Sequence, residues 1–162
     1  EIIVGITTEN VTEDKDSIFT ISINKPVSKN VEVILSNGDT VIIEAGETSA
    51  EYKVNAQGDD VIKDPSSVTV TLAGAKATDG TEFEKLTLSP QSPTSNITDT
   101  DNTVEVNLSV DNINPTEGDT VTFKVSLEDL DGVGGLDRHT GVKVTLSNGV
   151  VIEIPAGEIE GT

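Results

Sequence analysis

The amino-acid sequence predicts an all-β fold made of tandem β-sandwiches, and three features of the chain lead to this prediction. Val, Ile and Thr are abundant, and β-branched residues favour strands over helices. Apolar and polar residues alternate along most segments, as they do in strands that bury one face. Aromatic residues make up only 2% of the chain, so we expect thin, aliphatic cores.

An internal repeat organises the chain. Residues 30–51 match residues 141–162 at an offset of 111, and ten of the 22 aligned positions are identical, including the blocks LSNG and AGE. Upstream, residues 12–23 match residues 116–127 at an offset of 104. The difference of seven residues indicates an insertion in the second copy, and the repeat itself indicates tandem domains.

The two copies differ in length. We expect residues 1–103 to form a complete domain that ends in a linker at residues 98–103. Residues 104–162 correspond to the first half of that domain, so we expect a second domain that is truncated after about four strands. Half a sandwich has open sheet edges and half a core.

Turn residues separate the alternating segments and so place the strands. The pattern predicts seven strands in the complete copy and no helix longer than one turn, which is typical of an immunoglobulin-like Greek-key sandwich. The clearest strands of the second copy contain Val104–Val110, Val121–Leu127, Val142–Leu146 and Ile152–Ile154. The later strands of the first copy contain Glu51–Asn55, Val68–Ala73 and Phe83–Ile97, and Pro90 and Pro93 break the last of these.

Composition excludes several classes of function. The formal net charge of −19 argues against nucleic acid and anionic membrane surfaces as partners. The sequence contains no run of 18 apolar residues, the length that a membrane-spanning helix needs. Without Cys there is no disulfide, thiolate metal site or Cys nucleophile. No catalytic motif occurs, and the only histidine, His139, lies in a predicted loop, so we expect no enzyme activity.

The acidic residues concentrate at one predicted place. Loops of a sandwich alternate between its two ends, because consecutive antiparallel strands alternate in direction. On this scheme, the acidic loops of the first copy, the linker TDTDNT and the inserted loop at 128–141 meet at one inter-domain junction. The oxygen donors collected there are Glu13, Asp59, Asp60, Asp64, Asp99, Asp101, Asn102, Asp129, Asp131 and Asp137.

Such a cluster is suited to calcium. Crowded carboxylates repel one another, and Ca²⁺ relieves this by taking 6–8 oxygen ligands. Asp, Asn and Glu without Cys form a donor set for calcium and not for zinc or copper. We therefore expect Ca²⁺ to bind at the junction and stiffen it. The alternative is that each acidic loop is only solvated surface.

The order of short motifs resembles the repeated immunoglobulin-like domains of bacterial RTX adhesins. The matching stretches are Thr116–Asp119, Leu35–Gly38, Ala45–Glu47, Gly58–Pro65, Phe83–Leu86 and Ile97–Thr100. The resemblance implies type I secretion to the bacterial cell surface and calcium-stiffened extender repeats that support adhesion and biofilm formation. It also implies that the partners are neighbouring repeats of the same chain. The external ligand is not implied.

Two functions from different classes stay open at this point. The first is a structural extender of an adhesin. The second is a ligand-binding module that recognises a glycan, peptide or protein through the 128–141 loop or a sandwich face. The shortage of aromatic residues counts against the second, since sugar sites and binding hot spots favour aromatic side chains.

Overall fold

The computed structural model describes residues 1–162 and divides them into two compact units. The first unit comprises Glu1–Gly58 and Pro65–Asp99, and the second comprises Asp59–Asp64 and Thr100–Thr162. Apart from one 3-10 turn, every regular element is a strand, so the predicted all-β class is confirmed. No helix of the structure has the length and hydrophobicity needed to cross a membrane.

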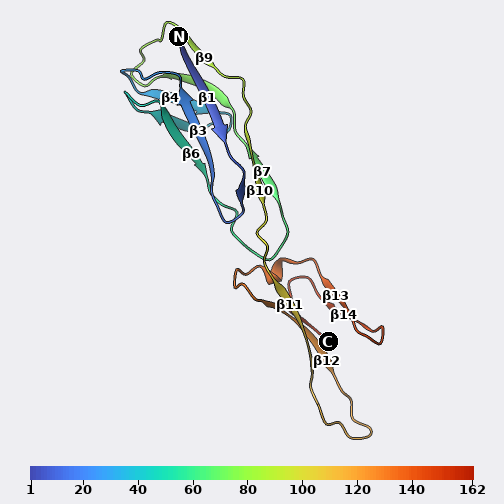
Figure 1. Ribbon diagram of the computed structural model, residues 1–162. Helices are drawn as coiled ribbons and strands as arrows, with labels where there is room; N and C mark the ends of the chain where they lie inside the picture. Colours follow the sequence, from blue (N-terminus) through green and yellow to red (C-terminus); the bar gives the residue numbers. More distant parts are fainter. The chain divides into compact units, whose positions relative to one another are not determined.

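The first unit is a sandwich of ten strand segments (Figure 1). They are β1 (Ile2–Thr8), β2 (Val11–Thr12), β3 (Ser17–Ile23), β4 (Val31–Leu35), β5 (Thr40–Ile43), β6 (Ser49–Val54), β7 (Ser66–Thr69), β8 (Leu72–Ala77), β9 (Leu86–Leu88) and β10 (Thr94–Thr98). Three pairs, β1/β2, β7/β8 and β9/β10, follow each other after short breaks. Counting each pair as one interrupted strand gives the seven predicted strands. The break between β9 and β10 spans Pro90 and Pro93, as predicted, because proline cannot donate a ladder hydrogen bond.

Three hydrogen-bonded sheets form the layers of the first unit, with strand orders β6-β3-β1-β9, β5-β4-β8 and β2-β10-β7. Neighbouring strands are antiparallel except that β1 pairs with β9 and β2 pairs with β10 in parallel. Both segments of the interrupted first strand therefore run beside segments of the interrupted last strand. This pairing brings the residues that follow β2 close to those that follow β10.

Alternation of side chains builds the core of the first unit. In β3 every second residue is buried, from Ser17 through Phe19 and Ile21 to Ile23, and the residues between them are partly exposed. The fully buried side chains of this unit are aliphatic apart from Phe19, Glu13, Ser17 and Ser95. The expectation of an aliphatic core is therefore confirmed for this unit.

The second unit repeats the early strands of the first. Its elements are β11 (Val104–Val110), β12 (Phe123–Asp129), the 3-10 turn η1 (Leu136–Arg138), β13 (Val142–Thr145), β14 (Val151–Ile154) and β15 (Glu160–Gly161). The sheets are β11-β12-β15 and β13-β14, with β11 and β13 at open edges. Four residues, Val125, Leu127, Ile152 and Ile154, form its buried core. The predicted boundary between residues 103 and 104 stays a prediction.

Candidate metal centre

Glu13 is the buried acid of the first unit. It follows β2, and its backbone N–H donates to the carbonyl of Thr98 at the end of β10 over 3.0 Å. Its own carbonyl accepts a hydrogen bond from the Gly58 N–H at 3.1 Å. Only 1% of Glu13 is exposed. The parallel β2–β10 pairing thus fixes the backbone of this residue and carries its side chain out of water.

Three carboxylates come together close to Glu13. Glu13, Asp64 and Asp99 can each offer an oxygen, and these atoms all lie within 4.8 Å of one another. Asp99 is the residue directly after β10, and Asp64 is bonded to Pro65, where the chain enters the first unit again. Ends of segments far apart in the sequence therefore supply the three acids.

This geometry and chemistry fit a calcium ion. Ca²⁺ binds oxygens at 2.3–2.6 Å, so two ligands on opposite sides of one ion are about 4.8 Å apart, as the spacing here allows. All donors are carboxylate oxygens, which suits a hard cation. A carboxylate that is as buried as Glu13 is costly without a compensating positive charge or hydrogen bonds.

Asp59 and Asn102 form a hydrogen bond within the second unit, and neither belongs to the group of three acids. The Asn102 side-chain amide donates to Asp59 Oδ1 at 2.6 Å and to the backbone carbonyl of Asp60 at 2.9 Å. The Thr100 hydroxyl also donates to Asp59 Oδ1. These hydrogen bonds connect residues 59–60 to Thr100 and Asn102 of the linker.

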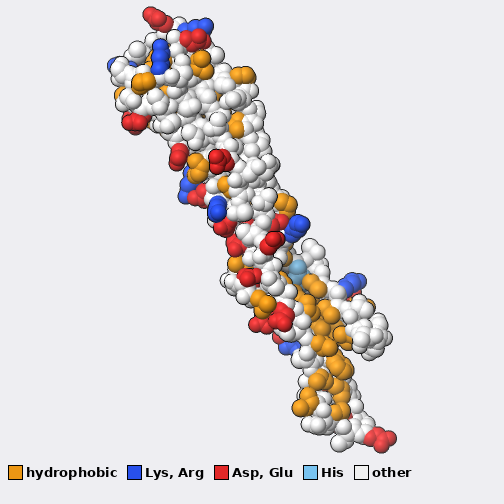
Figure 2. Space-filling view, viewed as in Figure 1, with side chains coloured by type: hydrophobic (Ala, Val, Ile, Leu, Met, Phe, Trp, Pro, Cys, Tyr) orange, Lys and Arg blue, Asp and Glu red, His pale blue; other side chains and the backbone are white.

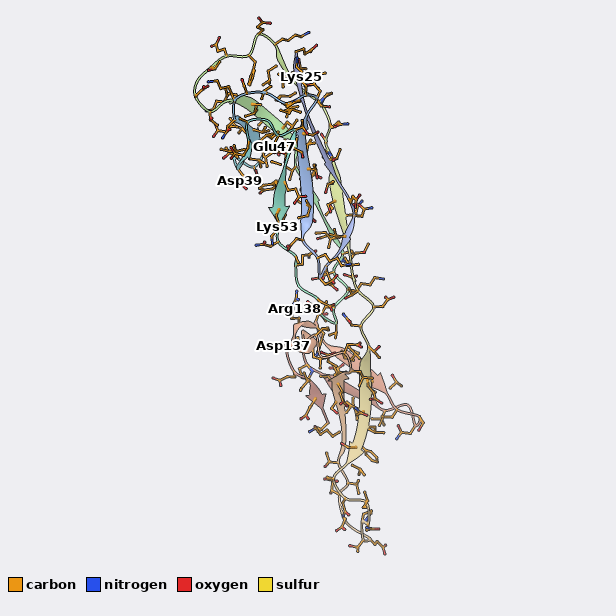
Figure 3. The ribbon with its side chains drawn as sticks, turned by 60° about the vertical axis from the view of Figure 1, so that its left-hand side comes forward. Lys25, Asp39, Glu47, Lys53, Asp137 and Arg138 are labelled. Atoms are coloured by element: carbon orange, nitrogen blue, oxygen red, sulfur yellow. The ribbon has the colours of Figure 1, made fainter.

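Asp60 forms an ion pair with Arg138, the only arginine of the chain. The Asp60 side chain is 8% exposed, and its Oδ1 also accepts a hydrogen bond from the Ile62 N–H at 2.7 Å. A side chain at Gly135, whose φ is +84°, would place its Cβ 2.8 Å from that of Asp60. The inserted loop therefore closes over Asp60 with glycine and arginine (Arg138 is labelled in Figure 3). Sequence reasoning missed this role of Arg138, although a lone arginine in so acidic a chain was a signal.

Arg138 also reaches one acid of the three-carboxylate cluster. Its second guanidinium nitrogen lies 3.3 Å from Asp64 Oδ2. This contact is longer than a close ion pair, and the Arg138 side chain is half exposed. Solvent screening therefore keeps the interaction weak.

The remaining predicted acids have other surroundings. Asp129 accepts hydrogen bonds from the backbone N–H groups of its own loop, at Gly134 (2.7 Å), Gly132 (2.9 Å) and Asp131 (3.0 Å). These bonds, chiefly that from Gly134, lower the pKa of Asp129 below its ordinary value. Asp131 accepts from the Thr103 N–H, while Asp101 and Asp137 are exposed.

His139 has a structural role in the second unit. Its Nδ1 accepts a hydrogen bond from the Gly141 N–H at 2.9 Å. Nε2 therefore carries the proton and donates it to the Glu158 carbonyl, 2.7 Å away. Both ring nitrogens are engaged with backbone groups, which leaves neither for a metal ion.

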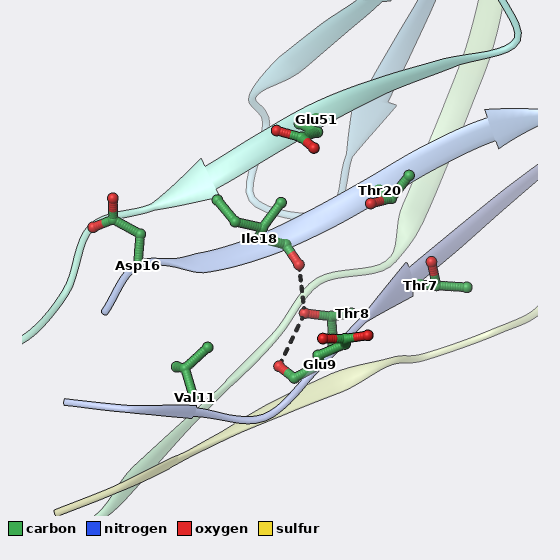
Figure 4. Close-up of a pocket in the computed structure, with 8 residues that line it drawn as sticks. All are labelled: Thr7, Thr8, Glu9, Val11, Asp16, Ile18, Thr20 and Glu51. Carbon is green, nitrogen blue, oxygen red and sulfur yellow. Dashed lines mark hydrogen bonds between the residues drawn. The ribbon is translucent and has the colours of Figure 1, made fainter. Parts of the chain in front are cut away.

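A shallow polar hollow on the first unit is the other candidate site (Figure 4). It has a volume of about 420 Å³ and is lined by Thr7, Thr8, Glu9, Val11, Asp16, Ile18, Thr20 and Glu51. The Thr8 hydroxyl donates a hydrogen bond to the Ile18 carbonyl at 2.7 Å, and Asp16 forms an ion pair with Lys53 at 2.7 Å. The Lys53 hydrogen bond lowers the pKa of Asp16. The residues that line this hollow include no aromatic side chain, which sugar sites and binding hot spots favour.

Comparison with known proteins shows the family. The LapA domain matches residues 2–100, which is more than half of the chain. The chain belongs to the LapA domain family. LapA domains are a family of biofilm adhesins, so the match indicates a cell-surface adhesin and agrees with the resemblance drawn from the short motifs.

The chain was also compared with solved structures and with curated proteins. The crystal structure of the apo form of the Calx CBD1 domain is similar at a TM-score of 0.42 and 15% sequence identity, covering 62% of this chain and 98% of that chain. The likeness is too low to support any argument about function. Comparison with curated proteins returns no match.

Proposed function

We propose that this LapA-family chain is a structural extender of a bacterial cell-surface adhesin, stiffened by calcium and without catalytic activity. The observation that carries the proposal is the LapA match over residues 2–100. Tandem copies of one domain support it, since a chain of similar modules gives length. Type I secretion and a place outside the cell belong to the same proposal, as does a role in adhesion and biofilm formation.

Calcium would be held by Glu13, Asp64 and Asp99. Their oxygens lie within 4.8 Å of one another, and the most buried acid of the chain is among them. A bound ion would supply a positive charge that offsets the burial of the Glu13 carboxylate. The residues themselves fix where the ion sits, because β2 and β10 hold Glu13 and Asp99 by backbone pairing.

Covalent connectivity links this site to stiffness. Asp99 is bonded to Thr100, the first residue of the main segment of the second unit, and Asp64 is the last residue of the segment 59–64. An ion that fixes both side chains restrains the chain at two of the three points where it passes from one unit to the other. Bending at these points then requires loss of calcium ligands.

The inserted loop does not favour the ligand-binding alternative. Its polar side chains are engaged within the second unit: Asp129 with loop amides, Arg138 with Asp60, and His139 with Glu158 and Gly141. A loop whose polar groups bind its own unit has few left for a glycan or a peptide.

Thermal unfolding with excess chelator and with millimolar Ca²⁺ tests the proposal. At a calcium concentration 100 times the dissociation constant, binding adds about 2.7 kcal/mol, which raises the melting temperature by several degrees. Asp99→Asn should abolish most of this rise. Asp101→Asn removes the same charge two residues away, from an exposed position, and should leave the rise intact.

Either of two results overturns the calcium step. The wild-type melting curve could be the same in chelator and calcium, or Asp101→Asn could lose as much of the rise as Asp99→Asn does. Stiffening is tested separately by small-angle scattering. A maximum dimension that does not respond to calcium contradicts it.

A further inference from the structure

Each repeat carries the tetrapeptide Leu-Ser-Asn-Gly in a tight hairpin. In the first unit it lies at the turn from β4 to β5, at residues 35–38, and in the second at the turn from β13 to β14, at residues 146–149. An asparagine before a glycine is chemically labile, because the glycine backbone nitrogen can attack the asparagine side-chain amide and no Cβ hinders its approach. Asn37 and Asn148 are therefore two copies of one candidate modification site.

The backbone of the two turns is the same. In each turn the glycine N–H donates to the leucine carbonyl three residues back, at 3.0 Å in the first unit and 2.9 Å in the second. The φ angle is +91° at Gly38 and +84° at Gly149, and a Cβ on either glycine would meet nothing within 4 Å. Each asparagine Oδ1 also accepts the N–H two residues further on, at 3.1 Å and 3.0 Å. The backbone therefore does not distinguish the two sites.

The side-chain nitrogen is where the two sites differ. Asn37 Nδ2 donates to Asp39 Oδ2 at 3.0 Å and to the Tyr52 hydroxyl at 2.7 Å. The Tyr52 hydroxyl in turn donates to the same Asp39 oxygen at 2.5 Å (Asp39 is labelled in Figure 3). In the second repeat Val150 stands at the position of Asp39, and Asn148 is hydrogen-bonded only through its oxygen. Asn37 is thus held at both ends of its amide, and Asn148 at one end.

The Asp39 carboxylate slows deamidation of Asn37 in two ways. The amide must leave its hydrogen-bond partners before its carbon can meet the glycine nitrogen, so each bond that is lost adds to the barrier. The attack then places negative charge on the amide oxygen, and a carboxylate at this short range repels that charge. The hydrogen bond to Asp39 also raises the pKa of Tyr52, so the network keeps its proton at mildly alkaline pH. Val150 provides none of these effects.

We propose that Asn148 is a site of spontaneous deamidation and that Asp39 protects Asn37 from the same reaction. The Gly149 nitrogen loses its proton to water and attacks Cγ of Asn148. A new C–N bond closes a succinimide ring, the Cγ–Nδ2 bond breaks, and the amide nitrogen takes a proton from water and leaves as ammonia. Water then opens the ring at either of its carbonyl groups, which gives aspartate or isoaspartate. The reaction requires only water.

Both products change the hairpin of the second unit. Each adds a negative charge to a unit whose surface already carries acidic side chains (Figure 2). Isoaspartate also lengthens the backbone by one methylene inside the turn, where the Gly149 N–H now donates to the Leu146 carbonyl. The lengthened turn disturbs the ladder in which Val144 pairs with Ile152. Hydrogen exchange in β13 and β14 should therefore speed up as isoaspartate accumulates.

Incubation of the full chain at mildly alkaline pH, followed by peptide mapping in a mass spectrometer, tests the proposal. Conversion changes the mass of the peptide that contains each asparagine, and chromatography separates aspartate from isoaspartate. Asn148 should convert about tenfold or more faster than Asn37, which is the effect on a rate of one hydrogen bond to a charged group. In the urea-unfolded chain the two sites should convert at similar rates, because the contacts of Asp39 are lost.

Exchanging the residue two positions after asparagine should exchange the protection. Asp39→Val should speed conversion of Asn37, and Val150→Asp should slow conversion of Asn148 by about tenfold. Val150 is 53% exposed, so this replacement removes no buried side chain. Tyr52→Phe leaves the bond between Asn37 and Asp39 in place, and it should speed conversion of Asn37 less than Asp39→Val does.

Three results overturn the proposal. The first is conversion of the two asparagines at equal rates in the folded chain, or faster conversion of Asn37. The second is a preference for Asn148 that persists unchanged in both Asp39→Val and Val150→Asp, which would assign it to local opening of the second unit. The third is an effect of Tyr52→Phe as large as that of Asp39→Val, which would remove Asp39 as the protecting group.

Discussion

The two repeats share the register of their early strands and differ in how deeply those strands are buried. Ile6 of β1 is 1% exposed, whereas Leu108, at the same register position of β11, is 55% exposed. Phe19 of the first repeat is buried, whereas its counterpart Phe123 is 47% exposed. By contrast, Ile43 and its counterpart Ile154 are both fully buried.

The difference separates two sources of burial in this fold. Packing of β14 against β12 needs only the first half of a repeat, so Ile154 and Val125 are buried in the second unit. Burial of the first strand needs the second half, because β7 to β9 and the residues beside them cover it. The first half of a repeat therefore sets the register of its strands, and the second half covers the apolar face of the first strand.

The largest expected effect comes from truncating the same position in both repeats. Ile6→Ala should lower the free energy of unfolding of the first unit by about 2–5 kcal/mol, since it leaves a cavity in a closed core. Leu108→Ala should change the stability of the second unit by about 0.5 kcal/mol or less. Urea unfolding followed by the fluorescence of Tyr52, the only tyrosine, reports on the first unit, and hydrogen exchange in β12 reports on the second. Equal losses in both units would contradict the comparison.

The ion pair of the inserted loop has no counterpart in the first repeat and should have an intermediate effect. Arg138→Gln leaves the buried carboxylate of Asp60 without its cation and should destabilise the second unit by about 1–3 kcal/mol. Lys143→Gln is the control, because its pair with Glu153 is exposed on both sides and should matter by less than about 0.5 kcal/mol. Hydrogen exchange in β12 measures both. The assignment fails if the control costs as much as Arg138→Gln.

The smallest expected effect is the pH dependence of the same loop. Hydrogen bonds from Gly134 and other loop amides lower the pKa of Asp129 in the folded state below its ordinary value of 3.8. The ionised carboxylate therefore favours folding above that value, and this contribution is lost as the pH falls through the lowered pKa. Asp129→Asn should make hydrogen exchange of the loop amides less sensitive to acid. Asp137→Asn, in the same loop, should leave this sensitivity unchanged. An unchanged acid response in Asp129→Asn would remove this assignment.

Most of the fold could be predicted because strand alternation and turn residues are local signals. The seven strands of the first repeat, the break at Pro90 and Pro93 and the register shared with the second repeat all follow from short-range patterns. The interruptions at Glu9–Asn10 and between β7 and β8 could not be predicted in this way. The first accompanies the change of pairing partner from β9 to β10, and the second accompanies the change of pairing partner from β10 to β4. Both are tertiary properties.

The candidate site was less predictable than the fold. Alternation of loop ends grouped ten oxygen donors at one place, and the structure brings three of them, Glu13, Asp64 and Asp99, within metal-binding distance. It gives Asp59, Asp60 and Asp129 hydrogen-bond or ion-pair partners instead. Strand order indicates the end of a sandwich at which an acidic residue lies. The hydrogen-bond or ion-pair partner of that residue depends on side-chain geometry, which local sequence patterns do not predict.

A calcium titration followed residue by residue in the backbone amide NMR spectrum tests the central claim most directly. The account predicts that the amides around Glu13, Asp64 and Asp99 shift first and together, and that those of the Asp129 loop respond little. Shifts confined to the Asp129 loop, or no shift near Glu13 and Asp99 at millimolar calcium, would contradict a calcium-stiffened extender.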